Sequence, residues 1–296
     1  MIVVKDLNKS FDNSNFMLDN INLNINKGSI YGLVGTNGAG KTTIIKHIVG
    51  ILKSDTGAVF IDSKDVYENE SVKSKLGYIP DDLYFFFGYN LKQMKEYYKG
   101  IYQSWSDDRY NEMVAEFNAD EDKGLVKLSK GMKKQMAFIL TMSTMPEYLI
   151  LDEPIDGLDP IVRRKVWKYI MSDVADREMS VLVSSHNLKE MESVCDTIGI
   201  MSNGKMKIER NLDSLKSDVH KIQLAYQEEM PNVLKMLNIL HREKRGSVEV
   251  IIVRGDIREI SEAIDRTRPV IKDILPLTLE EIFIYEIGGD KNDILI

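Results

Sequence analysis

The stretch Gly35-Thr36-Asn37-Gly38-Ala39-Gly40-Lys41-Thr42-Thr43 decides the fold, because its spacing is G-x-x-x-x-G-K-T. A hydrophobic run, residues 30–34, leads into it, and an amphipathic run, residues 44–49, follows it. In such a phosphate-binding loop, glycines let successive backbone N–H groups point at phosphate oxygens, and the helix that begins near Lys41 adds its positive dipole end. The stretch therefore predicts a nucleoside triphosphate site, with Lys41 on the β- and γ-phosphates and the Thr42 hydroxyl on Mg²⁺.

Length, charge and cysteine content narrow the class of protein. A chain of 296 residues can hold one nucleotide-binding domain and a smaller second domain. The net charge of −7 gives no basic footprint for wrapping nucleic acid, so no nucleic-acid partner is expected. The single cysteine, Cys195, excludes an internal disulfide framework and fits a reducing compartment. The chain opens directly on Met1-Ile2-Val3-Val4 and has no run of roughly 18 uncharged apolar residues, so we expect a soluble cytosolic chain that reaches a membrane only through a partner.

Strand-like alternation precedes the phosphate-binding loop. Residues 2–7 and 21–25 alternate apolar and polar side chains, which predicts a two-strand antiparallel flap beside the main sheet. Phe11 lies between these runs, close upstream of the loop. Two interpretations of Phe11 stay open, a ring that stacks on adenine and an ordinary hairpin aromatic.

The middle of the chain changes from strands to helices. Residues 57–62 and 75–79 are expected to be strands, the second ending at a Pro-stopped loop that contains Asp81. From residue 91 to residue 117 the period of the apolar residues is helical, which predicts a helical subdomain of about residues 84–145. The dense aromatic cluster of residues 84–87 fits either a core or a groove for a partner protein.

Two strand ends carry the residues suited to hydrolysis. The apolar strand within residues 147–154 ends in Asp152 and Glu153, as expected of a central parallel strand whose tip faces a nucleotide. Asp152 is the candidate for the Mg²⁺ shell, and Glu153 is the candidate to polarise or deprotonate an attacking water. The next strand, residues 180–185, ends at His186, which we interpret as a sensor that donates to the γ-phosphate or orients the water.

Three further motifs resemble those of one family. The stretch Leu128-Ser129-Lys130-Gly131-Met132-Lys133-Lys134-Gln135 resembles the "LSGGQ" signature of ATP-binding cassette (ABC) ATPases. Gly157-Leu158-Asp159-Pro160 resembles their D-loop, and His186 resembles their switch histidine. The resemblance covers about residues 1–215. It implies an α/β fold, with an ABC-type P-loop NTPase core, an antiparallel β flap and a helical subdomain.

The resemblance also implies a mode of ATP binding. In this family two cassettes form a head-to-tail dimer with ATP sandwiched between the phosphate-binding loop of one subunit and the signature of the other. Ser129 and Gly131 would then bind the partner's ATP, with Asp159 of the D-loop nearby at the same seam. Hydrolysis at Glu153 would remove the bridging γ-phosphate and reopen the dimer.

Some positions depart from the family pattern. Asp81 occupies the position usually held by Gln; a carboxylate can still ligate Mg²⁺ or a water, although it is shorter and charged. In the signature, Lys130 and Met132 replace Gly and Gln, whereas Ser129 and Gly131 are retained. An acidic residue at the Gln position together with "LSKGM" resembles the ATPase subunits of exporters of bacitracin-like peptide antibiotics and related bacterial peptide exporters.

The composition shifts near residue 217, so we assign residues 1–216 to the nucleotide-binding domain and residues 217–296 to a small α+β accessory domain. Its segments, expected from alternation and turn residues, are strands at 220–226, 239–242, 248–253 and 270–275, helices at 257–264 and 279–287, and a frayed end at 290–296. Tails with a similar "LTLEEIF" stretch, here residues 277–283, close many exporter ATPases of this branch.

Together these observations favour the ATPase motor subunit of a bacterial ABC exporter at the cytoplasmic face of the membrane. The resemblance implies a separate transmembrane permease, bound in a groove between the Asp81 loop and the helical subdomain, and a homodimer or a heterodimer with another ABC ATPase. The alternative is a soluble ABC ATPase acting on the ribosome or on nucleic acid. A long coiled-coil insertion does not fit between Lys41 and Asp152, and only one cassette is present, which disfavours that alternative.

Overall fold

The computed structural model describes residues 1–11, 17–227, 231 and 236–287. The chain forms two compact units. The first consists of residues 1–186 and 194–209, and the second of residues 187–193 with the described part of 210–296. The sequence predicts one boundary, between residues 216 and 217. In the structure, residues 210–216 and the short segment 187–193 group with the second unit.

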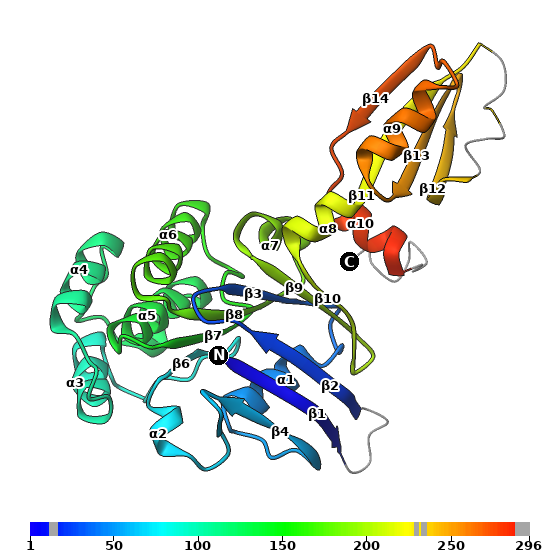
Figure 1. Cartoon of the computed structure of the whole chain (residues 1–296). Coiled ribbons are helices and arrows are strands. Elements are labelled where there is room, and N and C mark those ends of the chain that lie inside the picture. The colour runs from blue at the N-terminus through cyan, green and yellow to red at the C-terminus, as the bar shows by residue number, and fades with distance from the viewer. Residues whose placement is uncertain (12–16, 228–230, 232–235, 288–296) are drawn as a thin grey trace. The chain divides into compact units, whose positions relative to one another are not determined.

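A largely parallel sheet forms the centre of the first unit (Figure 1). Its strands, in spatial order, are β10 (Lys205–Asn211), β9 (Thr197–Ser202), β3 (Ile30–Val34), β8 (Ser180–Ser185), β7 (Tyr148–Asp152) and β6 (Leu76–Ile79). The strands from β9 to β6 pair in parallel. Every residue of β3, β7 and β8 is buried, which explains why these strands are continuous apolar runs rather than alternating ones.

The antiparallel flap is larger than the sequence predicted. It contains β2 (Met17–Ile25), β1 (Ile2–Ser10), β4 (Thr56–Ile61) and the short β5 (Lys64–Asp65), in that order. The expected two-strand flap is therefore wrong in size, because β4 pairs along β1, from Ile2 with Ile61 to Asn8 with Thr56. Apolar residues of the flap, of helix α1 (Lys41–Ile48) and of the parallel sheet form one buried core.

The expected helical subdomain is built by α3 (Leu91–Ile101), α4 (Asp107–Phe117), the 3-10 turn η1 (Leu125–Lys127) and α5 (Lys130–Ser143). The first unit also contains α2 (Glu70–Lys73) and α6 (Pro160–Arg177), whereas α7 (Leu188–Val194) falls almost entirely in the second unit. Helices α3 and α4 pack on α5 and lie together at one side of the unit (Figure 1). Helix α3 begins with a capping box formed by Asn90 and Gln93, and α4 begins at the capping Ser106.

The second unit is an antiparallel sheet with helices. Its elements are α8 (Leu212–Asp218), β11 (Val219–Ala225), β12 (Asn238–Arg245), β13 (Val248–Arg254), α9 (Ile257–Asp265), β14 (Ile271–Leu275) and α10 (Leu279–Ile287), with the strand order β12-β13-β11-β14. Ile260 and Ile264 of α9 pack on Ile222 and Leu224 of β11. The strands and helices expected for the accessory domain are therefore present, and the frayed end expected at residues 290–296 lies outside the described residues.

Candidate active site

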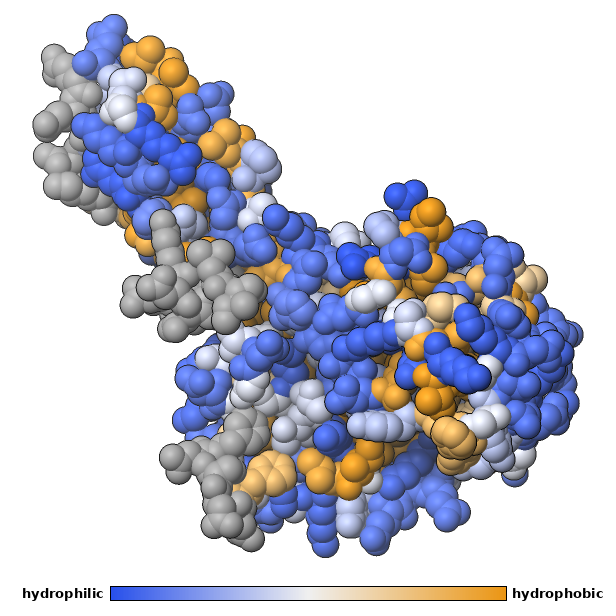
Figure 2. All heavy atoms as spheres, turned by 180° about the vertical axis from the view of Figure 1, so that it is seen from behind, coloured by the Kyte–Doolittle hydropathy of each residue, from blue (hydrophilic) through white to orange (hydrophobic). Residues whose placement is uncertain are grey.

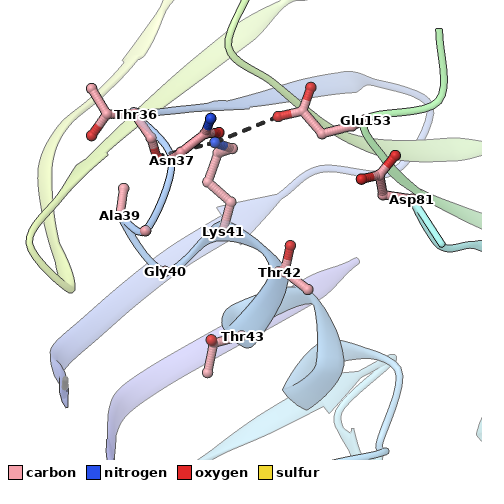
Figure 3. A pocket seen from close by; sticks show the side chains of 10 residues that line it. Thr36, Asn37, Ala39, Gly40, Lys41, Thr42, Thr43, Asp81 and Glu153 are labelled. Carbon is pink, nitrogen blue, oxygen red and sulfur yellow. Dashed lines mark hydrogen bonds and ion pairs between the residues drawn. The ribbon is translucent and has the colours of Figure 1, made fainter. Parts of the chain in front are cut away.

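The phosphate-binding loop joins β3 to α1 and lines a pocket of about 350 Å³. Gly40, the residue before α1, has φ 110° and so occupies the left-handed region that favours glycine. Gly35 is required by close packing, because a Cβ on it would lie 2.5 Å from the carbonyl oxygen of Met201. The lining consists of residues 36–43 together with Asp81 and Glu153 (Figure 3).

Lys41 is buried within the loop and points into this pocket. Its ammonium donates to the carbonyl oxygens of Gly35, at 2.7 Å, and Thr36, at 3.3 Å. The same Nζ lies 3.5 Å from Glu153 Oε1, the ion pair drawn as a dashed line in Figure 3. The loop therefore holds a cation between backbone carbonyls and the acid at the end of β7, where an anionic phosphate would be attracted.

Asp152 is the last residue of β7 and is buried. Its Oδ1 accepts the hydroxyl of Ser184, at 2.6 Å, from the neighbouring strand β8. The oxygen of the same hydroxyl accepts the backbone N–H of Glu153, at 3.0 Å. Ser184 thus holds both acids in place, a role that no sequence motif indicated. The buried carboxylate also affects Tyr78, because burial, and then the negative charge of Asp152, raise the pKa of Tyr78 to about 12.

Glu153 and His186, the two predicted catalytic residues, are in direct contact. His186 Nδ1 lies 3.0 Å from Glu153 Oε2, while the other carboxylate oxygen faces Lys41. The backbone of Glu153 is in the left-handed region, with φ 46°, which is uncommon for a residue with a side chain. The carboxylate of Asp156 also lies within 4.8 Å of this pair. The carboxylate of Glu153 is therefore held between a cation and an imidazole at the wall of the pocket.

Asp81 lines the pocket but also has partners that the sequence analysis did not foresee. Its Oδ1 lies 3.0 Å from Lys134 Nζ and 3.1 Å from Lys130 Nζ, both on α5. Partial burial opposes ionisation of this carboxyl, yet the hydrogen bonds from Lys134 and Lys130 lower the pKa of Asp81. Asp81 and Lys130 both depart from the family pattern and carry opposite charges, and this was the signal in the sequence that the two residues meet.

The oxygen donors around the pocket suit a hard cation. Thr42 is exposed on the first turn of α1, and its hydroxyl, the Asp152 carboxylate and the Asp81 carboxylate are ligand types that Mg²⁺ prefers. The chemistry of this set fits the predicted assignment of Thr42, Asp152 and Asp81 to a Mg²⁺ shell. That assignment stays a prediction.

The signature residues lie at the start of α5. Ser129 caps the helix, and its hydroxyl oxygen accepts the N–H of Met132 at 3.3 Å. A Cβ on Gly131 would lie 2.3 Å from the carbonyl oxygen of Gly157, so the signature and the segment that resembles a D-loop touch through their backbones. Asp159 caps α6 by accepting the N–H groups of Ile161 and Val162.

Five predicted ATP contacts among the described residues are not part of the lining of this pocket. Gly35 belongs to the loop and accepts a hydrogen bond from Lys41 through its carbonyl oxygen. The other four are Phe11, Ser129, Gly131 and Asp159. The ring of Phe11 lies 5.7 Å from Lys9 Nζ. Its stacking on adenine, and the contacts of the other three residues with ATP, stay predictions.

Comparison with known proteins agrees with this geometry. The family described as "ABC transporter" matches residues 18–156. The ABC transporter ATP-binding protein YtrB of Bacillus subtilis is 31% identical over 98% of this chain and 99% of its own length. The chain belongs to the ABC transporter ATP-binding family. This ABC protein is also similar to the bacitracin transport ATP-binding protein BcrA of Bacillus licheniformis. The two are 34% identical over 73% of this chain and 71% of the length of BcrA.

Solved structures confirm the fold class. The structure of the ATP-binding subunit of an ABC transporter matches 73% of this chain and 92% of its own with a TM-score of 0.68 and 27% identity. The predicted α/β cassette is therefore confirmed, and the chain is an ATP-hydrolysing subunit of an ABC transporter. None of the helices in the described residues combines the length and the apolar character needed to cross a bilayer.

Proposed function

We propose that this chain is the motor subunit of a bacterial exporter, in which ATP binding and hydrolysis drive a separate membrane permease from the cytoplasmic face. The observation that carries the hydrolytic part of the proposal is the arrangement of Glu153, whose carboxylate meets Lys41 of the phosphate-binding loop on one side and His186 on the other. ATP hydrolysis, unlike ATP binding alone, requires a base beside the phosphate site.

The residues divide the chemistry of hydrolysis among them. Lys41 and the N–H groups of the loop bind the β- and γ-phosphates. Thr42 and Asp152 would hold Mg²⁺, which would supply positive charge to neutralise the phosphate oxygens. Glu153 takes a proton from the attacking water or polarises it, and His186 orients that water. The contact between Glu153 and His186 supports this division, since each side chain fixes the orientation of the other.

The same proposal assigns Ser129 and Gly131 to the nucleotide of a second cassette. These two residues begin α5, whose N-terminal N–H groups suit an anion, and neither lines the pocket of its own Lys41. Two cassettes in head-to-tail arrangement would bring a signature to each γ-phosphate. The second cassette is another copy of this chain or a related ATPase subunit.

Exposed aromatic residues support the binding of a permease. Tyr84 and Phe87 are 91% and 92% exposed, which removes the alternative that they belong to the core. Phe86 beside them makes edge contacts with Tyr89 and Tyr97, and these three exposed rings form a connected surface. Figure 2 shows apolar residues gathered in patches on a mostly hydrophilic face of the first unit. Exposed apolar surface of this kind is typical of protein interfaces.

A groove runs close to this aromatic surface. It has a volume of about 250 Å³ and is lined by the end of α1, by β6, by α3 and by α5. The lining residues are Val49, Ile51, Lys73, Leu76, Gly77, Tyr78, Tyr98, Tyr102, Thr141 and Thr144. A short helix of the permease would lie here, between the parallel sheet and the helical subdomain.

Replacing Tyr84 and Phe87 by Ala tests the permease contact. Both side chains are almost fully exposed, so the isolated chain should keep its ATPase activity. Co-purification with its membrane permease should fall at least about tenfold, as expected for hot-spot aromatics. Met171→Ala, at a half-exposed apolar residue of α6, is the control and should leave both measurements unchanged. Unchanged co-purification of the double variant would contradict the proposed binding surface.

The direction of transport requires its own experiment. Proteoliposomes that carry the complex with the ATPase subunits outside should take up bacitracin-type peptides into the lumen when ATP is added, since an exporter moves its substrate away from the ATPase side. The Glu153→Gln complex is the negative control. ATP-driven loss of preloaded peptide from the lumen would show an importer instead, and co-purification of the chain with ribosomes rather than with a permease would favour the soluble alternative.

A further inference from the structure

Lys134, on the second turn of α5, is a buried lysine with its charge directed at the active site. Its side chain is only 1% exposed. The ammonium donates to Asp81 Oδ1, at 3.0 Å, and also to the backbone carbonyl oxygen of Glu153. A buried ammonium is costly unless it is paired and hydrogen-bonded, so these two acceptors fix where Nζ lies.

The backbone carbonyl that Lys134 holds belongs to the residue proposed as the catalytic base. Glu153 adopts a left-handed backbone conformation, and such conformations persist where surrounding groups determine them. Here the N–H of Glu153 donates to Ser184 Oγ at 3.0 Å, and its C=O accepts from Lys134. Side chains from β8 and α5 therefore bind the two polar backbone atoms of Glu153, and together they set the direction in which its carboxylate leaves the backbone.

Asp81 supplies the negative charge that a buried Lys134 needs. The same Oδ1 atom also meets Lys130, one turn earlier on α5, at 3.1 Å. Lys130 is 58% exposed, so water screens its ion pair and the pair contributes little. Lys134 is dry, so its contact with Asp81 is the stronger of the two.

We propose that Lys134 is a positioning residue for ATP hydrolysis, which fixes the backbone of Glu153 and uses Asp81 as its counter-ion. The inference rests on the proposed role of Glu153 as the base. The proposal assigns Asp81, which stands where the family usually has Gln, a partner within the same chain, namely Lys134. It also connects the helix that begins at the signature Ser129 to the base of the same subunit, through one side chain.

The first test is Lys134→Met in the full-length chain. Methionine keeps the apolar length of the side chain and removes the ammonium. Asp81 is 40% exposed and keeps Lys130 at 3.1 Å, so the substitution does not leave its carboxylate buried and unpaired. We expect kcat for ATP to fall about 10- to 100-fold, the size expected when a reacting group is misplaced by about 1 Å, while ATP affinity measured by titration changes less than about twofold. An unchanged kcat would overturn the inference.

Lys165→Met is the matched control. Lys165 on α6 also donates to a backbone carbonyl, that of Glu116, at 2.6 Å, and pairs with the carboxylate of the same residue at 3.2 Å. Lys165 does not belong to the site, so kcat of the Lys165→Met variant should equal kcat of the unaltered chain. An equal fall in kcat for both variants would show a general effect of losing a bonded lysine and would overturn the assignment of Lys134.

A double-mutant cycle separates positioning from a purely structural role. If Lys134 acts through the carboxylate of Glu153, the residual rate of Glu153→Gln should change less than about twofold when Lys134→Met is added, because residues that act as a unit are non-additive. Independent, multiplying losses would overturn the inference. Full activity of Glu153→Gln itself would instead overturn the proposed function, so the two failures are distinguishable.

Two further variants test the role of Lys134 even if the Lys134→Met variant folds poorly. Lys134→Gln keeps an N–H donor for the carbonyl of Glu153 and should lose less activity than Lys134→Met. Asp81→Asn removes the counter-charge at a carboxylate that is 40% exposed, and should lower kcat severalfold in the unaltered chain but add nothing to Lys134→Met. A further loss in the combined variant would show that Asp81 acts on its own and would overturn its assignment as the counter-ion.

Discussion

At the scale of single residues, the site is organised around Glu153. Its carboxylate meets Lys41 and His186, and its backbone meets Ser184 and Lys134. The carboxylate contacts bear on the chemistry, whereas the backbone contacts set the position from which that chemistry occurs. Because Ser184 also donates to buried Asp152, one hydroxyl supports the base and the candidate metal ligand together.

Ser184→Ala should therefore affect both stability and turnover. Removing the hydroxyl leaves Asp152 and the N–H of Glu153 without this buried partner, which should lower the free energy of unfolding by about 1–3 kcal/mol. Ser180→Ala, at the other end of β8, removes a bond to the N–H of Gly28 and is the control. Urea denaturation should show a loss in both variants, and steady-state ATPase assays should show a fall in kcat for Ser184→Ala alone.

Sequence motifs predicted one part of this residue network and missed another. Lys41, Glu153 and His186 lie on a recognisable loop or at strand ends, and the topology of a parallel sheet brings such ends to one edge. Ser184 depends on the register that sets it opposite Asp152, and Lys134 depends on how α5 packs. Neither the register nor the packing follows from local spacing, so the motifs did not assign a role to either residue, although Lys134 stands within the signature-like stretch.

At the scale of secondary-structure elements, α5 joins the signature to the catalytic strand. Ser129 caps its N-terminus, Gly131 touches the backbone of Gly157 on the chain leaving β7, and Lys134 reaches Glu153. The contacts of Gly131 and Lys134 thus join the first turns of α5 to the chain that leaves β7. A nucleotide bound at the signature would bear on the position of Glu153 through these contacts.

Gly131→Ala tests the close approach of α5 to the segment after β7. The added Cβ would lie 2.3 Å from a backbone oxygen, so the two backbones must separate. We expect a loss of about 1–3 kcal/mol of unfolding free energy, as for overpacked cores, and reduced ATPase activity. Gly100→Ala in α3 meets nothing within 4 Å and should be neutral or stabilising by up to about 1 kcal/mol. Equal thermal melting of both variants would contradict the argument.

The elements also show where local patterns stop predicting structure. The run at residues 57–62 was correctly expected to be a strand, but its place beside β1 depends on a pairing between distant segments. The aromatic run at residues 84–87 had two interpretations because hydrophobicity does not reveal whether a neighbour covers a side chain. The structure leaves Tyr84 and Phe87 exposed, which a pattern of residue types does not report.

At the scale of the whole molecule, one chain holds a phosphate-binding loop and a signature that do not share a pocket. Ser129 and Gly131 lie outside the lining formed by residues 36–43, Asp81 and Glu153. A γ-phosphate held by Lys41 therefore receives donors from a signature only if a second cassette supplies them. The separation of the two motifs within one chain supports the proposed dimer.

Glu153→Gln should trap that dimer. The substitution keeps the size of the side chain and removes the base, so turnover should fall about 10²- to 10⁴-fold while ATP stays bound at the seam. Size-exclusion chromatography with light scattering, at saturating ATP and Mg²⁺, should show twice the monomer mass for the variant. The unaltered chain should return to the monomer mass as its ATP is consumed.

The control combines Lys41→Ala with Glu153→Gln, because a triphosphate that is not held in the loop cannot bridge two cassettes. The combined variant should stay monomeric at the same ATP concentration. A dimer that forms equally well without ATP would show that nucleotide is not the bridge. A lone monomer peak for Glu153→Gln would contradict pairing between two copies of this chain. The second cassette would then be a different ATPase subunit, and mixing the two proteins with ATP should give a heterodimer.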